Sequence, residues 1–343
     1  MRSEDRIKMV LGLLVLFLFG SSLFVVPVHA QIKLTYANFP PAPTFPCIQM
    51  ERWKTEVEKR TNGKVKVMTF PGSSLLGAKN MFDGVISGMA DIGCLTLGYQ
   101  PGRFPVSEAA DLPVEMPNAK VASLVVLDLV QKYNPKEFEK VKILTMFSCA
   151  PSNFMTQVPV KSVKDIKGLE LRVVGTAADV LKLLGGIPVG MPQSDTPEAL
   201  QKGVVKGVIS SMEVLKDLNY AAYCPYATIT NIQTYAFVVA MNKDKWNSLP
   251  NDVKKILDDL SRDQAIWTGK YADDHVLEAL EWSKQKYGHK VFTISEADRA
   301  EIRKRLKPVR DDYIKRMNAM GLPGDQIVSD VYKLKEKYEK LYK

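Results

Sequence analysis

The sequence has little of what enzymes usually need. It holds three histidines in 343 residues, and only His275 and His289 lie after residue 30. Both stand in or beside polar helical sequence, which predicts exposed side chains without a chemical role. No HExxH, GxSxG, P-loop or GxGxxG pattern occurs, so peptidases, serine hydrolases and common nucleotide-binding folds have no sequence support. The sequence therefore predicts a protein that is not an enzyme and uses no cofactor.

Cysteine is also scarce. Cys47, Cys94, Cys149 and Cys224 are separated by 47, 55 and 75 positions, and these spacings fit neither a CxxC motif nor a zinc site. Cys94 and Cys149 lie in apolar segments, which favours buried free thiols. Disulfides are the alternative if the protein is exported, and four cysteines allow three pairings.

Positive charge is in excess, because 47 Lys and Arg stand against 38 Asp and Glu, a formal net charge of +9. Such a protein attracts anions or acidic surfaces. No basic run is interleaved with aromatic residues, so nucleic acid is not an expected partner. A small anionic molecule fits the composition better.

Residues 1–30 have the pattern of an export signal. A basic start is followed by the apolar "MVLGLLVLFLFGSSLFVV", and Val28-His29-Ala30 ends in a small residue. This pattern predicts cleavage after Ala30 and a periplasmic protein. An uncleaved membrane anchor is the alternative, because the apolar stretch is nearly long enough to span a bilayer. No cysteine sits at the predicted cut, so we do not expect a lipid anchor.

Strand-like and helix-like segments alternate along most of the remaining chain. "KVKVMTF" and "GLELRVV" read as strands, and "NAKVASLVVLDLVQKY" reads as a helix. This alternation predicts βα units around largely parallel sheets, an α/β fold. Removing the signal leaves 343 − 30 = 313 residues, enough for about two domains.

The segment 251–287 is exceptional, because its 37 residues contain no proline and a single glycine, Gly269. Apolar residues recur in it at helical spacing. One continuous helix would be on the order of 55 Å long, at about 1.5 Å per residue, and would have to run across two lobes. Two helices with a break near Gly269 are the alternative.

Arg172 stands in the strand-like "GLELRVVG", between the apolar Leu171 and Val173. A buried guanidinium costs several kcal/mol unless a partner or water meets it. We expect Arg172 to hold the acid group of a ligand as a two-pronged pair, because its planar fork matches two acid oxygens. The alternatives are an ion pair with Glu170 or a position on a wet sheet edge.

Other polar and aromatic residues cluster where predicted strands end, which is where open α/β sheets bind ligands. Together with Arg172 they suit a small organic anion. The candidate ligand-binding residues are Asn38, Phe39, Tyr99, Asn153, Phe154, Met191, Ser211, Met212, Glu213 and Tyr235. Each has a plainer interpretation: Phe39, Phe154 and Met191 as core, Asn153 as a turn residue, and Glu213 as a first-turn acid of a helix.

Several segments are similar to one known family. "LPVEMPNA", "VPVKSVKDIKGLELRVVGTAADVLKLLGGIPVGMPQSDTPEALQKGVVKGV" and "MNKDKWNSLP" resemble the extracytoplasmic solute-binding proteins of tripartite ATP-independent periplasmic (TRAP) transporters. "GKVKVMTFPGSSLLG" and "GYQPGRFP" agree with the same family. The resemblance covers essentially the whole chain after residue 30.

The resemblance implies a fold and a function. The fold is a two-lobed α/β clamshell of the periplasmic-binding-protein type (type II-like), with a long helix spanning both lobes. We assign 31–150 plus 241–277 to lobe 1 and 151–240 plus 278–343 to lobe 2. The expected protein is a monomer that carries no catalysis, captures an organic acid and hands it to membrane subunits of the transporter.

The resemblance also implies roles for residues. Arg172, in "DIKGLELRVVG", occupies the place of the family's signature arginine, which pairs with the ligand carboxylate. Many relatives have an asparagine shortly after "GVVDG", whereas this chain has "GVVKGVISSMEVL" with Glu213, which disfavours a second acid group. The ligand is expected to be a monoanion, with sulfonates and dicarboxylates as alternatives. A periplasmic enzyme and a ligand-sensing partner protein on the same scaffold are the alternative functions.

Overall fold

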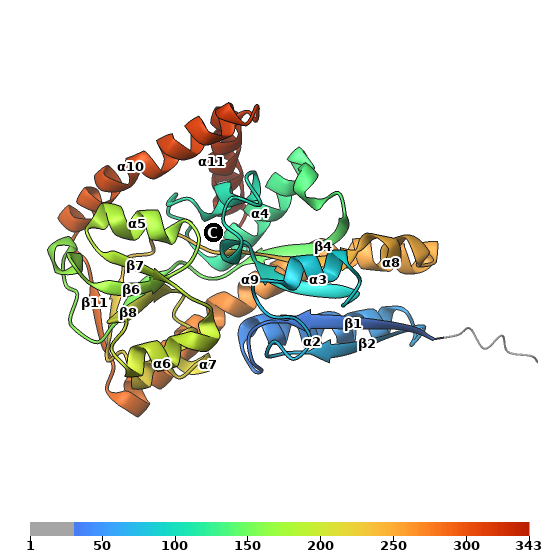
Figure 1. The fold of residues 1–343 in the computed structure, drawn as a ribbon, viewed down its shortest axis with the longest axis horizontal. Coiled ribbons are helices and arrows are strands. Elements are labelled where there is room, and N and C mark those ends of the chain that lie inside the picture. The colour runs from blue at the N-terminus through green and yellow to red at the C-terminus, as the bar shows by residue number, and fades with distance from the viewer. Residues whose placement is uncertain (1–30, 343) are drawn as a thin grey trace, which may run out of the picture.

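The computed structural model describes residues 31–342. The predicted signal peptide, with its cleavage after Ala30, lies outside the described residues, as does residue 343. Within residues 31–342, no helix combines the length and apolar character that a membrane crossing requires. The described chain forms two α/β lobes side by side, and one long helix runs along both of them (Figure 1).

The first lobe is built on a five-stranded sheet in the order β2-β1-β3-β10-β4. Its strands are β1 (Ile32–Asn38), β2 (Val65–Phe70), β3 (Ile92–Thr96), β4 (Val141–Ser148) and β10 (Ala236–Asn242). β1 is parallel to β2 and β3, and β10 is antiparallel to β3 and β4. The helices of this lobe are α2 (Phe45–Arg60), α3 (Met81–Ile86), α4 (Ala119–Tyr133) and α8 (Lys243–Ser248).

The second lobe is built on a six-stranded sheet in the order β11-β9-β5-β8-β6-β7. Its strands are β5 (Asn153–Thr156), β6 (Glu170–Val173), β7 (Ile187–Gly190), β8 (Gly207–Ser210), β9 (Tyr226–Ile229) and β11 (Lys290–Thr293). β6 is parallel to β7 and β8, and β5 is antiparallel to β8 and β9. Short helices α5 (Ala177–Leu184), α6 (Thr196–Gln201) and α7 (Val214–Asp217) join these strands.

The chain crosses between the lobes at β4 to β5 and again at β9 to β10, so each lobe combines separate parts of the sequence. A third connection is α9 (Asn251–Tyr287), a single helix of 37 residues. It contacts α2, α4 and β4 of the first lobe and α7 of the second. The one-helix prediction is therefore confirmed, and the break near Gly269 is wrong.

Gly269 has a packing role in α9. A Cβ atom at this position would lie 2.5 Å from the Cα of Lys120, at the start of α4. Because real Cβ atoms do not approach backbone so closely, only glycine lets α4 and α9 come together here. The glycine that suggested a break marks a close helix crossing.

Two helices end the chain, α10 (Glu296–Ala319) and α11 (Gly324–Leu341). α10 packs against α5 of the second lobe, whereas α11 packs against α4 of the first. A bond of 2.7 Å from the Tyr133 hydroxyl to Asp330 ties α4 to α11. The lobe boundaries stay a prediction, and we amend them by proposing that 324–341 belongs with lobe 1.

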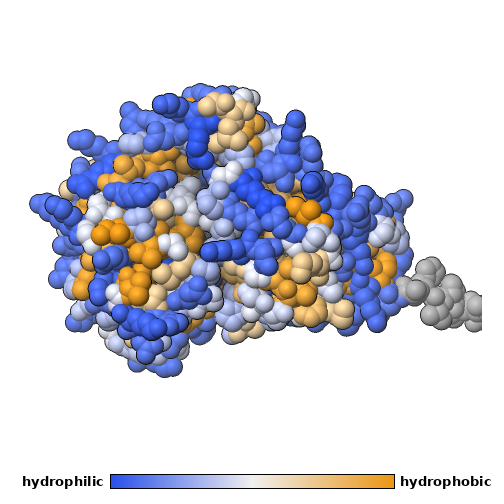
Figure 2. All heavy atoms as spheres, viewed as in Figure 1, coloured by the Kyte–Doolittle hydropathy of each residue, from blue (hydrophilic) through white to orange (hydrophobic). Residues whose placement is uncertain are grey.

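The surface is mostly polar, with apolar patches on the second lobe (Figure 2). Apolar atoms are exposed in the region where Figure 1 draws β6, β7 and α5. Leu183 of α5 and Ile187 of the edge strand β7 are among the exposed large apolar side chains. The main apolar core runs through both lobes, and a second cluster lies between α4, α10 and α11.

Candidate functional site

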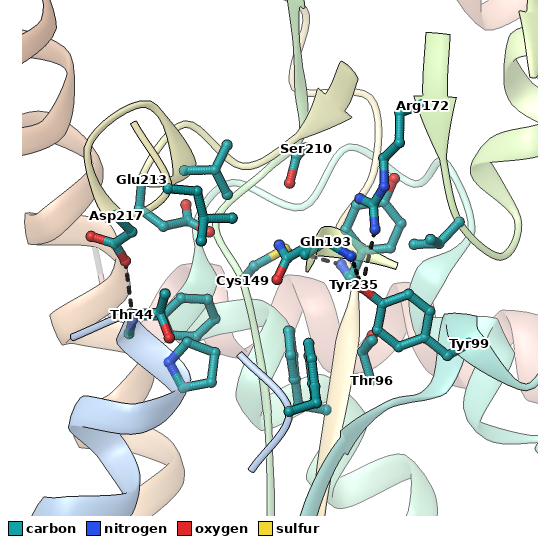
Figure 3. Close-up of a pocket in the computed structure, with 17 residues that line it drawn as sticks. Thr44, Thr96, Tyr99, Cys149, Arg172, Gln193, Ser210, Glu213, Asp217 and Tyr235 are labelled. Atoms are coloured by element: carbon teal, nitrogen blue, oxygen red, sulfur yellow. Dashed lines mark hydrogen bonds between the residues drawn. The ribbon is translucent and has the colours of Figure 1, made fainter. Parts of the chain in front are cut away.

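A cavity lies between the two sheets, lined by residues of both lobes (Figure 3). The space in it that is not filled by atoms is about 500 Å3, counting solvent at its mouth. Its walls begin where β1, β3, β6 and β8 end, with Phe39, Thr96, Val174 and Ser210. Strand ends thus supply the site, as open α/β sheets commonly do.

Arg172 of β6 forms one end of the cavity. Its side chain is buried, with the residue 2% exposed, and Nε donates to the carbonyl of Met191 at 3.1 Å. Nη2 donates to the Tyr99 hydroxyl at 3.0 Å. Among residues 31–342, no carboxylate oxygen lies within 4.0 Å of its guanidinium. The ion pair with Glu170 and the wet sheet edge are therefore both wrong.

The neighbours of Arg172 are themselves held in place. Tyr99 belongs to a single 3-10 turn, Leu97–Tyr99, that follows β3. Its hydroxyl oxygen also accepts a hydrogen bond from the backbone N–H of Gln193 at 3.1 Å, and the Gln193 carbonyl accepts from Tyr220 at 3.2 Å. The guanidinium is thus oriented by groups of both lobes without being neutralised by either.

Aromatic rings form the middle of the cavity. Phe39 meets Tyr99 edge-on with ring centroids 5.3 Å apart, and it stacks on Phe237 at 6.4 Å. Phe45 meets Phe237 edge-on at 5.6 Å. Such a wall favours a flat or apolar ligand body.

Glu213 and Asp217 form the opposite end. Glu213 is buried, 4% exposed, and accepts a hydrogen bond from the Ser211 hydroxyl. Asp217, at the end of α7, accepts the backbone N–H of Phe45 at 3.1 Å. Its other oxygen lies 2.6 Å from Nε2 of His275. Figure 3 shows these acids at the far side of the cavity from Arg172, with Cys149 and Tyr235 between them.

Burial and neighbouring charges shift the pKa values at this end. Burial raises the pKa of Glu213 to about 7, and the charge of Asp217 adds to the effect. The hydrogen bond to Asp217 raises the pKa of His275, against the opposing effect of burial. Burial also raises the pKa of the Cys149 thiol, so this cysteine is a poor nucleophile.

Both ends of the cavity join the lobes. The Tyr99 hydroxyl of the first lobe bonds to Arg172 and Gln193 of the second, and Asp217 of the second bonds to Phe45 of the first. Beside Arg172 the two backbones nearly touch, because a Cβ atom on Gly175 would lie 3.0 Å from the Cα of Gly98. These contacts describe a closed arrangement of the lobes.

Five of the residues predicted from the sequence line this cavity: Phe39, Tyr99, Arg172, Glu213 and Tyr235. Two others lie one step behind it, since Met191 holds Arg172 through its carbonyl and Ser211 donates to Glu213. Their roles toward a ligand remain predictions.

Four predicted residues lie in the protein framework instead. Asn38 donates to the Pro46 carbonyl at 2.7 Å, and Asn153 accepts the backbone N–H of Thr230 at 2.7 Å. Phe154 and Met212 are buried among core residues. For Phe154 the plainer interpretation as a core residue is confirmed, whereas Asn153 is the first residue of β5 and not a turn residue.

Other residues of the lining were not predicted from the sequence, namely Thr44, Cys149, Gln193 and Asp217. The prediction of exposed side chains was wrong for both histidines, because His275 is 7% and His289 is 5% exposed. Polar neighbours along one helix do not reveal what packs across it from elsewhere. The four cysteines are buried free thiols, as predicted. In the described part of the chain, no group of three or more His, Cys, Asp or Glu side chains could hold a metal ion.

Residues 37–316 match the family model DctP, described as "Bacterial extracellular solute-binding protein, family 7". A crystal structure of a TRAP periplasmic solute-binding protein from Desulfovibrio salexigens, an open complex, is 55% identical. It covers 90% of this chain and 97% of its own, with a TM-score of 0.82. The C4-dicarboxylate-binding protein DctB of Bacillus subtilis is 24% identical over 75% of each chain.

A TRAP solute-binding protein from Rhodoferax ferrireducens, in complex with copurified benzoate, is 26% identical. It covers 91% of this chain and 100% of its own, with a TM-score of 0.87. These structures confirm the two-lobed α/β clamshell. The chain superposes better on the benzoate complex than on the open structure, although the open structure has about twice the sequence identity.

Proposed function

The chain belongs to the bacterial extracellular solute-binding proteins of family 7, the solute receptors of TRAP transporters, and on this premise we propose which solute chemistry it captures. It holds a small organic acid by its carboxylate, or a sulfonate, in the cavity between the lobes and delivers the acid to the membrane subunits of a TRAP transporter. The receptors of this family are transport proteins, not enzymes. Export by a signal peptide cleaved after Ala30, and action as a monomer, belong to the same proposal.

The observation that carries this proposal is the state of Arg172. Its guanidinium stays charged at any relevant pH, is buried, and has a carbonyl and a phenol as partners but no carboxylate among the described residues. A buried charge without a counterion is costly. A ligand carboxylate would supply the counterion and could use both prongs of the fork.

Similar proteins support an acid as the ligand. Structures with 25–29% identity to this chain are complexes with benzoate, 3-hydroxybenzoate, meta-hydroxyphenylacetate and mandelate. In the open structure that is 55% identical, the C-terminus of a symmetry mate is bound in the ligand-binding site. All of these groups present a carboxylate, and the aromatic wall of Phe39 and Phe237 suits a ring beside it.

The test is a thermal-shift screen of organic acids on protein that has been unfolded and refolded to remove copurified ligand. Hits are then measured by calorimetry on the wild type and on Arg172→Ala. We expect one acid per monomer, recovered chemically unchanged by mass spectrometry, and loss of binding in the variant. A panel of carboxylates and sulfonates without any hit, or equal binding by both proteins, would contradict the proposal.

A further inference from the structure

We propose that the cavity end opposite Arg172 selects acids that carry a hydrogen-bond donor, a hydroxyl or amino group, and rejects acids with a second carboxylate. The inference rests on the proposed function, because it takes Arg172 as the partner of the first carboxylate. It assigns to Glu213 and Asp217 the recognition of the rest of the ligand.

The end of the cavity around Glu213 and Asp217 offers a ligand hydrogen-bond acceptors more than donors. Its main donors are already used within the protein: the Phe45 N–H bonds to Asp217 at 3.1 Å. The Thr44 hydroxyl donates to the Pro41 carbonyl at 2.7 Å, and the Ser211 hydroxyl donates to Glu213. What the end offers a ligand is therefore carboxylate oxygens, which accept hydrogen bonds. A ligand group that donates finds partners there, and a group that only accepts does not.

The acidic side chains at this end also disfavour a second negative charge on the ligand. Glu213 lines the cavity without a basic partner within 4.0 Å among residues 31–342. The nearby basic groups already have acidic partners within the protein. His275 lies between Asp217 and Glu278, and the Lys216 ammonium bonds to Glu278. A second ligand carboxylate would approach Glu213 and Asp217 in a site of low dielectric, where like charges repel strongly. A neutral hydroxyl or an ammonium group meets no such penalty.

The two charged ends lie apart, on opposite sides of the cavity. Figure 3 shows Arg172 at one side and the acids Glu213 and Asp217 at the other. Cys149, Gln193 and Ser210 line the cavity between them. The donor should therefore be separated from the carboxylate by an apolar or aromatic body rather than placed next to it.

The experiment uses two series of acids that differ in one terminal group. The aromatic series is benzoate with methyl, hydroxyl, amino or carboxylate at position 3 or 4. The aliphatic series is heptanoate, 6-hydroxyhexanoate, 6-aminohexanoate and heptanedioate (pimelate). Calorimetry at pH 7.5 on refolded wild-type protein should show, in at least one series, that the hydroxy or amino acid binds about tenfold or more tightly than the methyl-terminated acid. The dicarboxylate should bind at least about tenfold more weakly than the methyl-terminated acid, because unpaired buried polar groups discriminate by such factors.

The variant Glu213→Gln tests whether Glu213 is responsible for rejecting a second carboxylate. It removes the negative charge and keeps nearly the same shape, so the discrimination against the dicarboxylate should fall about tenfold. Glu170→Gln is the matched control, because it removes a charge from β6 outside the cavity lining. At pH 5.5 the wild type should resemble Glu213→Gln, since burial raises the pKa of Glu213 to about 7 and the protonated carboxyl becomes a donor.

The outcomes separate this inference from the proposed function. Equal binding of methyl-, hydroxy- and amino-terminated acids overturns the inference and leaves an acid receptor. Dicarboxylates that bind as tightly as the hydroxy acids would also overturn the inference and leave an acid receptor. If no acid of either series binds, the inference is also overturned, and the broader screen with Arg172→Ala decides the proposed function. If Glu213→Gln does not fold, the ranking of acids on the wild type still decides.

Discussion

The two ends of the cavity carry opposite charges. They differ in whether the charged side chain has a partner of opposite charge within the protein. At one end the Arg172 guanidinium is held by a carbonyl and a phenol, and no carboxylate of the described chain neutralises it. At the other end Asp217 has both His275 and the Phe45 N–H as partners. A buried charge that the protein pairs contributes to its own stability, whereas one left unpaired costs stability until a ligand arrives. The comparison assigns the anchoring of the ligand's first carboxylate to Arg172, and it assigns a stabilising role to the paired Asp217 at the second end.

The largest expected effect concerns the arginine end. Arg172→Ala should weaken acid binding by about 2–5 kcal/mol, the usual result of removing one partner of a buried charge pair. Arg172→Lys should also weaken it strongly, because the charge remains but the fork is lost. The unfolding free energy without ligand should stay level or rise. Calorimetry and urea unfolding measure the two quantities.

Arg299→Ala is the control for this prediction, because its guanidinium bonds to the Thr230 carbonyl outside the cavity lining. It should leave affinity unchanged. If Arg172→Ala keeps its affinity and loses stability instead, the arginine end is structural and the comparison fails.

An effect of similar size, on stability instead of affinity, is expected at the acidic end. Asp217→Ala removes one member of a buried pair, leaves the Phe45 N–H without its acceptor, and leaves His275 with the exposed Glu278 as its acidic partner. Such changes commonly cost about 3–5 kcal/mol of stability, so the apo protein should unfold at clearly lower urea. Asp179→Ala, which removes an exposed acid paired with Lys182, should change stability by less than about 1 kcal/mol. Equal stabilities of the two variants would remove the contrast between the ends.

A smaller effect is the pH dependence that Glu213 contributes. Its pKa rises from the ordinary value of 4.5 to about 7 on burial in the folded protein. The folded state therefore keeps a proton that the unfolded state has lost. Its stabilising contribution is complete below pH 4.5 and is lost as the pH rises through about 7. Relative to wild type, Glu213→Gln should gain on the order of 2 kcal/mol between pH 5 and pH 8.

Urea unfolding of both apo proteins at several pH values gives this difference directly. Other titrating groups, such as His275, are present in both proteins and largely cancel. Ser210→Ala, a neighbouring change without a titratable group, should show a difference from wild type that does not vary with pH. A flat difference for Glu213→Gln as well would mean that its carboxyl is hydrated in the folded protein.

The sequence predicted the parts of this site that depend on local pattern. The strand "GLELRVVG" located Arg172 at a strand end, and strand-end position also indicated Phe39, Tyr99 and Glu213. The long helix 251–287 followed from its spacing and the lack of proline. The resemblance to TRAP receptors added the two-lobed arrangement.

What the sequence could not predict depends on contacts between distant segments. Asp217 and His275 are 58 positions apart and meet because α7 packs against α9, so the polar sequence around the histidine suggested exposure. Gly269 looked like a helix break because its reason, the approach of α4, lies far along the chain. Asn153 was a reasonable ligand candidate by position, but its amide holds the backbone at Thr230, which only the folded chain reveals.

The smallest expected effect concerns how closely the lobes meet beside Arg172. A Cβ atom on Gly98 would lie 3.3 Å from Cγ2 of Val174 and 3.4 Å from the backbone N of Gly175, both in the second lobe. Gly98→Ala should therefore hinder closure without disturbing either lobe alone. We expect affinity for the acid to fall about three- to tenfold, roughly 1 kcal/mol, with unchanged unfolding of the apo protein.

Gly190→Ala is the control for this prediction, because a Cβ atom there meets nothing within 4 Å. Small-angle scattering should show wild type and control becoming more compact with ligand and the Gly98 variant less so, since closure by hinge bending brings the lobes together. Full closure and full affinity in the Gly98 variant would show that the lobes do not need this contact, and that the two charged ends alone hold them together.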